Sequence, residues 1–453
     1  MTLPCIPLAQ TDPVAAFRAL AGQPWAMLLH SAAADPVRGR FSYAVAEPVA
    51  TLESVDGIVR LDGRPVAGDP FAALAAMLAG SPPAAPAGPA PFAGGAVGFI
   101  GYEAGRHLEK LPARHGNPER QPEMAFGLYD TVAVYDHVEE RAWVQAARPE
   151  AMGRAKRLAV RLSAPPIAPS ALPSVAWRSE LARADYLARV ATILDYIRAG
   201  DIYQANLTQR FLADRPAGFD PYALFERLCA DNPAPFAAFL HCGQALQIAS
   251  ASPERFLSLG ADGRIETRPI KGTAARHADP AADAAAAAAL AASAKDRAEN
   301  LMIVDLMRND LGRAARIGSV RVPTLFAVES FATVHHLVSA VEGRLRPGLG
   351  PVDLLRAAFP GGSVTGAPKL RAMEIVDELE VSRRGAYCGS VAWIGFDGAM
   401  DSSIVIRTVS ATPTLLHAQA GGGIVADSDP AAEHAEMMVK VAPLLRAAGE
   451  VPR

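Results

Sequence analysis

The chain has 453 residues, half of them hydrophobic and a fifth charged, so it can bury a large core. Its formal net charge is −3 and it carries no Lys/Arg cluster, which argues against binding to nucleic acid or to an anionic membrane. No apolar run approaches membrane-spanning length and the first basic residue is Arg18, so we expect neither a transmembrane helix nor a signal peptide. The four cysteines lie far apart without a CxxC pair, which indicates reduced thiols and a cytoplasmic location.

In chain order, the predicted elements alternate irregularly between strands and helices. The Pro/Ala-rich residues 163–175 predict a linker between an N-terminal region, 1–165, and a larger region, 180–447. Strand-like runs occur at 131–136, 245–259, 389–396 and 402–413, and helical patterns cover about 183–199, 280–309 and 429–446. Because these elements form no regular βαβ repeats, they predict an α+β architecture with largely antiparallel sheets.

The helix predicted at about 280–309 carries a carboxylate on an apolar face. Glu299 shares that face with Ile303 and Leu306, and Lys295 lies one turn before it. A carboxylate in such surroundings needs a partner. From this helix alone, an ion pair with Lys295 and a bound cation are equally good interpretations.

The last predicted helix repeats this pattern. Asp429 and Pro430 suit its N-cap and its first helical position, and Glu433, Glu436 and Lys440 follow on a stripe that is otherwise hydrophobic. One carboxylate from each of two helices, completed by water and an anionic ligand, is a usual way to hold Mg²⁺. No His/Cys set accompanies the glutamates, which argues against zinc.

Two features near the last helix indicate an anion site. Gly421, Gly422 and Gly423 let backbone N–H groups approach an anion closely, although a lone glycine run is more often a plain turn. Arg407 lies in the apolar strand predicted at 402–413, where a buried guanidinium needs a partner such as a substrate carboxylate. Together these residues favour a small dianionic ligand.

A single lysine stands out because lysine is rare in this chain. Only six of the 44 basic residues are lysines, and one of them, Lys271, lies in a predicted turn bounded by Pro269 and Gly272. An arginine stays protonated in proteins, whereas a lysine amine can lose its proton and attack an electrophile. The sequence therefore predicts that Lys271 is present for its chemistry.

Nine segments, in collinear order over roughly 180–445, together resemble the chorismate-utilising enzymes. They read GDIYQANLTQRF (200–211), SPERF (252–256), PIKGT (269–273), KDRAENLMIVDLMRNDLGR (295–313), VHHLVSAVEG (334–343), GGSVTGAPKLRAMEIVDELE (361–380), GAYCGSVAWIGF (385–396), IVIRT (404–408) and AGGGIVADSDPAAEHAEMMVK (420–440). The resemblance implies the fold of that family, a large, mostly antiparallel β-sandwich core flanked by helices.

The resemblance also implies site residues, matched position by position. It makes Glu299 and Glu436 ligands of Mg²⁺ with Glu433 in or next to that shell, Lys271 the nucleophile, and Glu254 the general acid. His336 is matched as well, although a buried histidine that makes its hydrogen bonds within the protein and has no catalytic role is an equally good interpretation of that residue. The substrate-binding positions that it implies are Gln204, Gly272, His336, Ser363, Tyr387, Arg407, Gly421, Gly423 and Lys440.

Two positions indicate which chemistry within the family the resemblance implies. Gln204 stands where isochorismate and salicylate synthases carry a lysine that activates water, which argues for ammonia as the nucleophile and against an isomerase. Lys271 stands in PIKGT where anthranilate synthases typically read PIAGT, and this lysine marks the members that make 4-amino-4-deoxychorismate on the route to p-aminobenzoate and folate. An anthranilate-forming enzyme is the alternative; a non-catalytic protein that binds chorismate or tryptophan is disfavoured because the matched acids and lysine are retained.

The resemblance implies partners in addition to chorismate. None of the four cysteines lies in a glutaminase nucleophile elbow, so ammonia is expected from a separate glutamine amidotransferase subunit. Residues 1–165 resemble the N-terminal region of anthranilate synthase component I. Within them, MLLHSA (27–32) is similar to a segment that lines a tryptophan-binding cleft in relatives, which implies tryptophan as a further ligand.

Overall fold

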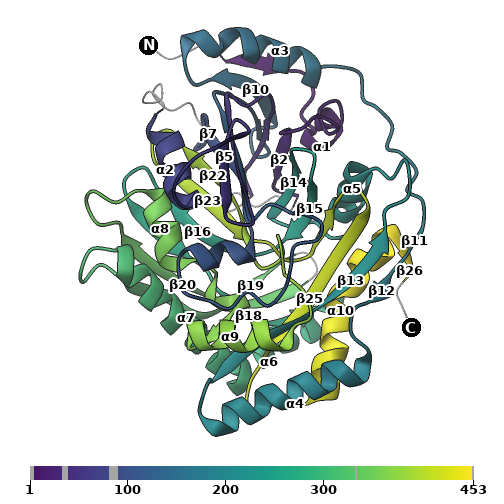
Figure 1. Ribbon diagram of the computed structural model, residues 1–453, viewed down its shortest axis with the longest axis vertical. Coiled ribbons are helices and arrows are strands. Elements are labelled where there is room, and N and C mark those ends of the chain that lie inside the picture. Colours follow the sequence, from purple (N-terminus) through teal and green to yellow (C-terminus); the bar gives the residue numbers. More distant parts are fainter. Residues whose placement is uncertain (1–4, 33–38, 81–89, 332–333, 451–453) are drawn as a thin grey trace.

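The computed structural model describes residues 5–32, 39–80, 90–331 and 334–450 (Figure 1). Two large antiparallel sheets form its centre. In spatial order, the first sheet contains β1 (Ile6–Leu8), β10 (Arg141–Ala146), β9 (Thr131–Asp136), β3 (Phe41–Val45), β2 (Met27–His30), β14 (Phe236–Cys242), β15 (Leu246–Ser252), β24 (Thr408–Ala411), β25 (Leu415–Ile424), β13 (Gln204–Asp214) and β12 (Arg178–Ser179), with β21 (Gly366–Ala367) also on β13.

The second sheet is built in the same way. Its order is β18 (Ile270–Ala275), β20 (Val334–Arg344), β17 (Arg264–Thr267), β16 (Arg255–Leu259), β23 (Met400–Ile404), β22 (Ser390–Gly395), β7 (Gly95–Ile100), β8 (Met124–Tyr129), β4 (Ala50–Val55), β5 (Ile58–Leu61) and β6 (Arg64–Pro65), with β19 (Arg321–Ser330) also on β20. A short parallel pair, β11 (Val175–Ala176) with β26 (Gly449–Glu450), lies outside both sheets.

Helices cover the outer faces of the two sheets. They are α1 (Pro13–Phe17), α2 (Pro70–Ala79), α3 (Met152–Leu162), α4 (Arg183–Ala199), α5 (Pro221–Asp231), α6 (Pro280–Ala292), α7 (Ala294–Ala314), α8 (Pro351–Ala358), α9 (Lys369–Leu379) and α10 (Pro430–Ala448), and the 3₁₀ turns are η1 (Tyr102–His107), η2 (Pro149–Ala151) and η3 (Gly362–Val364). Among the described residues, none of these helices combines the length and apolar character that crossing a bilayer requires.

Three apolar clusters hold these layers together. One packs α3, α4, α5 and α10 on the first sheet, and a second packs α2, α7 and α8 on the second sheet. The third lies between the sheets, where Tyr43 of β3 meets Trp393 of β22 with ring centroids 6.2 Å apart. This sandwich of two antiparallel sheets flanked by helices confirms the predicted fold class.

Both sheets combine strands from the two regions predicted at 1–165 and 180–447. In the first sheet, Leu28 of β2 is paired with Phe239 of β14. In the second, β7 is paired with β22 over its whole length, from Gly95 to Ile100. Residues 165–174, within the predicted linker, contain neither helix nor strand. The linker therefore joins two stretches of chain that share their sheets.

Two of the predicted helices are confirmed, and one is corrected. α4 ends at Gly200, whose φ of 85° suits a glycine C-cap, and α10 begins after the Asp429 N-cap. The single helix predicted at about 280–309 is instead two helices, α6 and α7. They are separated at Ser293, whose extended backbone breaks the helix while its side chain accepts a hydrogen bond from the Asp296 amide and caps α7.

Two of the predicted strands are also split. The run at 245–259 forms β15 and β16, and the run at 402–413 falls within β23 and β24. In each case one strand belongs to the first sheet and the other to the second. The chain therefore crosses from sheet to sheet at residues 253–254 and again at 405–407. Val405 and Ile406 continue the apolar pattern through the second crossing, so the sequence pattern does not reveal it, whereas Pro253 and Glu254 do interrupt the pattern at the first.

Candidate active site

A cavity of about 520 Å³ opens beside these two crossings and is bordered by α7 and α10. We refer to it as the main cavity. It brings together every predicted site residue except Gln204, from nine separate parts of the chain. They are Glu254, Lys271, Gly272, Glu299, His336, Ser363, Tyr387, Arg407, Gly421, Gly423, Glu433, Glu436 and Lys440.

The two crossings place Glu254 and Arg407 side by side at one end of the main cavity. The Ile404 amide donates to the Glu254 carbonyl at 3.0 Å, and the Ala251 amide donates to the Arg407 carbonyl at 3.0 Å. The apolar neighbours of Arg407 predicted that it lies in a strand, but it does not. It lies in the turn between β23 and β24 with a φ of 53°, a left-handed conformation that ends the strand.

The Glu254 carboxyl group is suited to donate a proton at neutral pH. Its side chain is buried, and this burial raises its pKa to about 7, although a hydrogen bond from Ser363 and the charge of Lys271 act in the opposite direction. A carboxylic acid with this pKa keeps its proton in about half of the molecules at pH 7, whereas an ordinary glutamic acid is almost fully ionised there, so Glu254 can act as a general acid.

Lys271 projects into the same cavity from the edge of the second sheet. It lies in β18 and not in the turn that the neighbouring Pro269 and Gly272 predicted, because β18 pairs with β20 despite a register shift between Ile270 and Thr273. Burial lowers the pKa of Lys271, and the charges of Glu299 and Glu254 only partly offset this effect. A larger fraction of Lys271 is therefore neutral, and the neutral amine is the nucleophilic form.

Gly272 lets the chain pass α7 closely. Its φ is 84°, and a Cβ at this position would lie 2.9 Å from both Asp296 Cγ and Leu290 Cδ1. A larger residue would push β18 away from α7. The glycine next to Lys271 thus fixes the distance between that lysine and the acidic helix.

Carboxylates of α7 and α10 form the opposite wall. The Lys295–Glu299 ion pair is present at 3.9 Å, and Lys440 Nζ lies 2.7 Å from Glu436 Oε1. Glu433 is buried and accepts a hydrogen bond from Ser428 at 2.6 Å. Burial raises the pKa of Glu299, and the nearby Glu433 charge adds to the increase. For Glu436, the effect of burial is outweighed by Lys440, so its pKa is lowered.

The donor set fits a magnesium ion. Among the described residues, no three His, Cys, Asp or Glu side chains lie close enough to form a metal site by themselves, but Mg²⁺ usually takes only one or two carboxylates and fills its shell with water and substrate oxygens. Glu299 and Glu436 come from different helices and face one cavity. The charge of Glu433 disfavours the charged form of Glu299, and a bound cation would oppose this effect.

The glycine run of β25 leaves room between these helices and the sheet. A Cβ at Gly422 would lie 3.1 Å from Glu433 Oε2, and one at Gly421 would lie 2.1 Å from the Leu207 carbonyl oxygen. Lys440 donates to the Gly421 carbonyl at 3.1 Å, so its ammonium group is held at the wall of the cavity. A side chain at Gly422 would extend toward Glu433 and Lys440, whereas one at Gly421 would collide with the neighbouring strand β13.

Arg407 and Tyr387 lie at the other end of the main cavity. Burial lowers the pKa of Arg407, partly offset by Tyr387, so this guanidinium lacks a full counter-charge and can bind a carboxylate. His336 lies beside them, and its Nδ1 is 2.9 Å from the Thr273 hydroxyl. Burial lowers the pKa of His336, which favours the neutral ring. A neutral histidine here fits a positioning role.

Gln204 lies behind the wall of the main cavity. Its side chain is fully buried in β13, and a Cβ at Gly423 would come within 2.8 Å of its Nε2 atom. Gln204 therefore lies next to Gly423 and is not in the lining of the cavity. Asn206 and Gln419, which the sequence did not single out, do line it. Both are polar residues on strands that also carry predicted site residues, and that alternation is the signal that could have found them.

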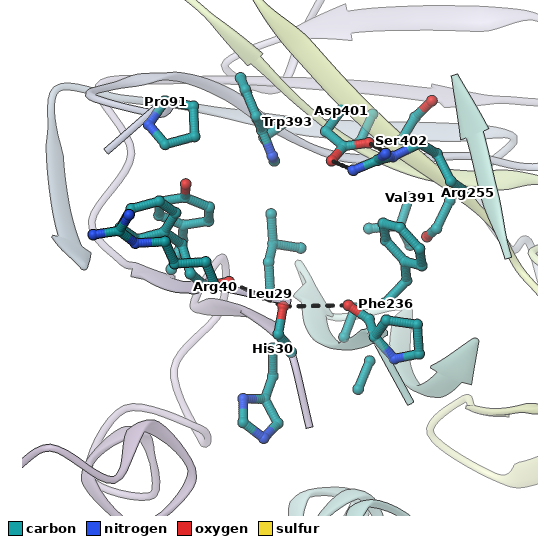
Figure 2. Close-up of a pocket in the computed structure, with 18 residues that line it drawn as sticks. Leu29, His30, Arg40, Pro91, Phe236, Arg255, Val391, Trp393, Asp401 and Ser402 are labelled. Atoms are coloured by element: carbon teal, nitrogen blue, oxygen red, sulfur yellow. Dashed lines mark hydrogen bonds and ion pairs between the residues drawn. The ribbon is translucent and has the colours of Figure 1, made fainter. Parts of the chain in front are cut away.

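The predicted N-terminal segment 27–32 borders a second cavity, of about 230 Å³, between the two sheets. Figure 2 shows Leu29 pointing toward Trp393, while the His30 ring points away from the space between them. At one side, Arg255 donates to both carboxylate oxygens of Asp401, at 2.9 and 3.0 Å. The cavity thus combines an aromatic wall with a charged rim.

The comparisons with known proteins agree with this geometry. Residues 29–446 match the family model described as chorismate binding enzyme. The chain is 48% identical over 432 residues to aminodeoxychorismate synthase component 1 of Klebsiella aerogenes, covering 94% of each chain. It is 42% identical over 457 residues to anthranilate synthase component 1 of Streptomyces coelicolor, covering 96% of this chain and 86% of that protein.

A solved structure shares the whole fold. The crystal structure of anthranilate synthase component I from Streptococcus pneumoniae superposes with a TM-score of 0.81 at 32% identity, and the match covers 98% of this chain and 100% of that one. The two sheets, with the main cavity beside their crossings, are therefore the architecture of a known family of enzymes.

Proposed function

The chain belongs to the chorismate binding enzymes, and on that premise we propose that it is a component 1 of aminodeoxychorismate synthase, which converts chorismate and ammonia into 4-amino-4-deoxychorismate. The observation that carries the proposal is that the Lys271 amine and the Glu254 carboxyl group share the main cavity, each with its pKa displaced toward the form that the reaction needs. The reaction makes the chain a transferase of the transaminating class, and its free cysteines suit the cytoplasm.

Chorismate carries two carboxylates, and the main cavity offers a site for each. Glu299 and Glu436, with Glu433 beside them, would hold Mg²⁺, which when bound supplies a clamp for the ring carboxylate and Lewis acidity. Lys440 and the backbone of β25 support the same carboxylate. Arg407 and Tyr387 bind the enolpyruvyl carboxylate at the other end.

The chemistry then needs one nucleophile and one acid. The neutral Lys271 amine forms a bond to ring carbon 2, the two ring double bonds shift, and the bond between carbon 4 and its hydroxyl breaks. Glu254 gives its proton to that hydroxyl, which leaves as water, because hydroxide itself is a poor leaving group. Ammonia next forms a bond to carbon 4, the double bonds shift back, and Lys271 leaves carbon 2 as a free amine. One proton of the added ammonia returns to Glu254.

Replacing Lys271 tests this assignment. We expect Lys271→Ala to lose at least a hundredfold in the rate of aminodeoxychorismate formation from chorismate and ammonium chloride, because the covalent route through the Lys271 amine is removed and only a weaker direct attack by ammonia remains. The matched control is Lys110→Ala, at an exposed position, which should keep the wild-type rate. A mass adduct of chorismate less water on Lys271 would identify the covalent bond, and an unchanged rate in Lys271→Ala would contradict the proposal.

Anthranilate formation is the second candidate, because anthranilate synthases are among the similar proteins. The products separate the two activities: anthranilate has lost pyruvate and is fluorescent, whereas aminodeoxychorismate keeps the enolpyruvyl group. The lysine of PIKGT favours aminodeoxychorismate. Product mass from the purified chain with chorismate and ammonium chloride decides between them.

A separate glutamine-hydrolysing subunit is proposed as the source of ammonia. Cys242, in the segment nearest to a glutaminase pattern, is fully buried, and burial raises the pKa of its thiol, so it cannot serve as a nucleophile. We expect the purified chain to use ammonium salts and to be inactive with glutamine alone. Product formation from glutamine without a second protein would contradict this partner.

Tryptophan is proposed as the ligand of the second cavity. The support is its shape and chemistry: Leu29, Tyr43 and Trp393 form an apolar and aromatic wall, and Asp401 with Arg255 forms a charged side. The indole ring would pack on the apolar wall, and the ammonium and carboxylate groups of the amino acid would interact with Asp401 and Arg255.

A further inference from the structure

One buried lysine, Lys369, lies outside the lining of the main cavity. It is the first residue of α9, and its side chain is only 13% exposed. Of the other five lysines in the chain, three line the main cavity and two are exposed. The first three are Lys271, Lys295 and Lys440, and the exposed two are Lys110 and Lys156. A buried lysine that does not face the cavity therefore needs an explanation of its own.

The Lys369 ammonium group uses all three of its N–H donors. Its Nζ atom lies 2.6 Å from Asp310 Oδ2 and donates to the carbonyl oxygens of Ala358 and Pro360, each at 2.9 Å. An ammonium group directs three donors toward different sides, whereas a guanidinium group presents a planar fork. Three acceptors around one nitrogen therefore suit lysine, in a chain that elsewhere prefers arginine.

The acceptors of Lys369 belong to different elements. Asp310 is a buried residue of α7 and lies about three turns after Glu299, on the same face of that helix. The two carbonyl groups belong to the last residue of α8 and to the segment 359–364, which we call the Ser363 loop. Lys369 thus joins α7 to a loop that borders the main cavity.

The Ser363 loop passes closely between α7 and β23. A Cβ at Gly362 would lie 2.6 Å from Leu306 Cδ2 of α7, and a Cβ at Gly361 would lie 2.6 Å from Ile404 Cδ1 of β23. These two glycines bring no side chain that could anchor the loop. Its position therefore depends on hydrogen bonds to its backbone.

Buried cations supply such hydrogen bonds on both sides of Ser363. Lys369 donates to the carbonyl group of the loop before Ser363, and Arg384 donates to the Val364 carbonyl after it, at 2.8 Å. Ser363 itself forms a hydrogen bond with the Glu254 carboxyl group. The loop is thus held where its serine meets the proposed general acid.

The Ser363 hydroxyl affects the acid strength of Glu254. Burial raises the pKa of Glu254, whereas the hydrogen bond from Ser363 lowers it because it stabilises the carboxylate form. The charged groups that face Glu254 are Lys271 of β18, which also lowers its pKa, and Arg407 of the neighbouring crossing. Without the serine hydroxyl, Glu254 would be a weaker acid.

We propose that Lys369 and Asp310 are positioning residues, whose ion pair fixes the Ser363 loop on α7 so that the Ser363 hydroxyl stays on the Glu254 carboxyl group. The inference rests on the proposed function, in which Glu254 protonates the departing hydroxyl of chorismate. Neither residue of the pair is in the lining of the main cavity. The pair therefore acts on the reaction through the loop and not by contact with the substrate.

The test replaces the ion pair by apolar side chains of similar size. Such a replacement of a buried pair is often neutral or stabilising, so the double variant Lys369→Met with Asp310→Leu should fold while the loop carbonyls lose their donor. We expect the alkaline limb of kcat/KM for chorismate to move up by about one pH unit. We also expect kcat to fall about tenfold while the KM for chorismate stays within about twofold.

The matched control is an exposed ion pair on the same helix. Asp305 and Arg308 are paired at 2.7 Å on the outer face of α7. The double variant Asp305→Leu with Arg308→Met should leave kcat, the KM for chorismate and the alkaline limb unchanged.

Ser363→Ala separates a positioning role from a general loss of structure. This variant should show the same shift of the alkaline limb, and adding the replacement of Lys369 and Asp310 to it should cause no further shift. Equal shifts with and without the Ser363 hydroxyl would overturn the proposal, and so would an unchanged limb in the folded double variant.

A second variant and a second measurement keep the test decisive if the double variant does not fold. Asp310→Asn keeps the size of the side chain but removes its charge, and Asp305→Asn is its control. Amide hydrogen–deuterium exchange at residues 361–366, which needs no enzyme activity, should be about tenfold faster in Asp310→Asn than in the control. Equal exchange would overturn the proposal, whereas absence of any aminated product from the wild type would refute only the proposed function.

Discussion

At the scale of single residues, the site depends on two groups whose pKa values move in opposite directions. Burial keeps Glu254 protonated to about pH 7 and increases the neutral fraction of Lys271. In water near pH 7, by contrast, a carboxyl group is ionised and an ammonium group keeps its proton. The same buried surroundings would therefore favour both the proposed acid and the proposed nucleophile.

The alkaline limb of the pH profile should report Glu254. Only its protonated form can donate, so kcat/KM for chorismate, measured at constant free ammonia, should fall above about pH 7, approaching tenfold per pH unit. We expect Glu254→Gln to lose 100-fold or more in rate, within the usual range for a general acid, and to lose this limb. A limb that persists in Glu254→Gln would assign it to another group.

At the scale of elements, breaks between strands and helices position the groups proposed to be catalytic. The two sheet crossings carry Glu254 and Arg407, and the Ser293 break allows α7 to begin beside β18 with Glu299 on its inner face. The sequence pattern identified α4 and α10 well because Gly200 and Asp429 mark their ends. It missed the second crossing because Val405 and Ile406 continue the apolar pattern, and only pairing with distant strands decides where each strand stops. At the first crossing, Pro253 and Glu254 do interrupt the pattern.

The N-cap of α10 gives a test at this scale. The Asp429 side chain accepts from the Ala432 amide at 2.8 Å, at the start of the helix that carries Glu433 and Glu436. We expect Asp429→Ala to lower the free energy of unfolding by about 1 kcal/mol, seen as a lower urea midpoint, and Asp429→Asn to restore most of it. Asp427→Ala, at an exposed position just before the cap, is the matched control and should leave the midpoint unchanged.

At the scale of the whole molecule, the two sheets share one interior. The Tyr43–Trp393 contact joins a strand of the N-terminal region to one of the C-terminal region, and it lies beside the second cavity. A ligand in that cavity contacts both sheets at once. Its binding should therefore stabilise the molecule as a unit and not only one region.

Tryptophan should raise the thermal unfolding midpoint by several degrees. A ligand at one hundred times its Kd adds about 2.7 kcal/mol to the free energy of unfolding. Leu29→Trp, which fills the cavity from within, should abolish the shift while circular dichroism shows a folded chain, and phenylalanine should give a smaller shift in the wild type. An equal shift for Leu29→Trp and wild type would place the amino acid elsewhere.

The candidate site was largely predictable from sequence, and the cavities around it were not. Residues such as Lys271 and Glu299 stand out because they contradict the local pattern of the chain, and the structure places them in one cavity. Gln204 was expected to face the substrate but lies behind Gly423. A cavity such as that of about 290 Å³ beside residues 114–123 and 381–385 left no local signal, because its walls come from a loop and from strands far apart in the chain. Polar residues such as Gln419 become informative only after strand alternation shows which of them share a face.

The pairing of β7 with β22 has a consequence for how a cell makes this protein. During translation the first hydrophobic strands leave the ribosome long before their neighbours exist, so their backbone edges stay open while most of the polypeptide is still being made. Such nascent chains are prone to aggregate. Production in a host with ample chaperones and slow synthesis should therefore yield more active protein than fast expression at high temperature.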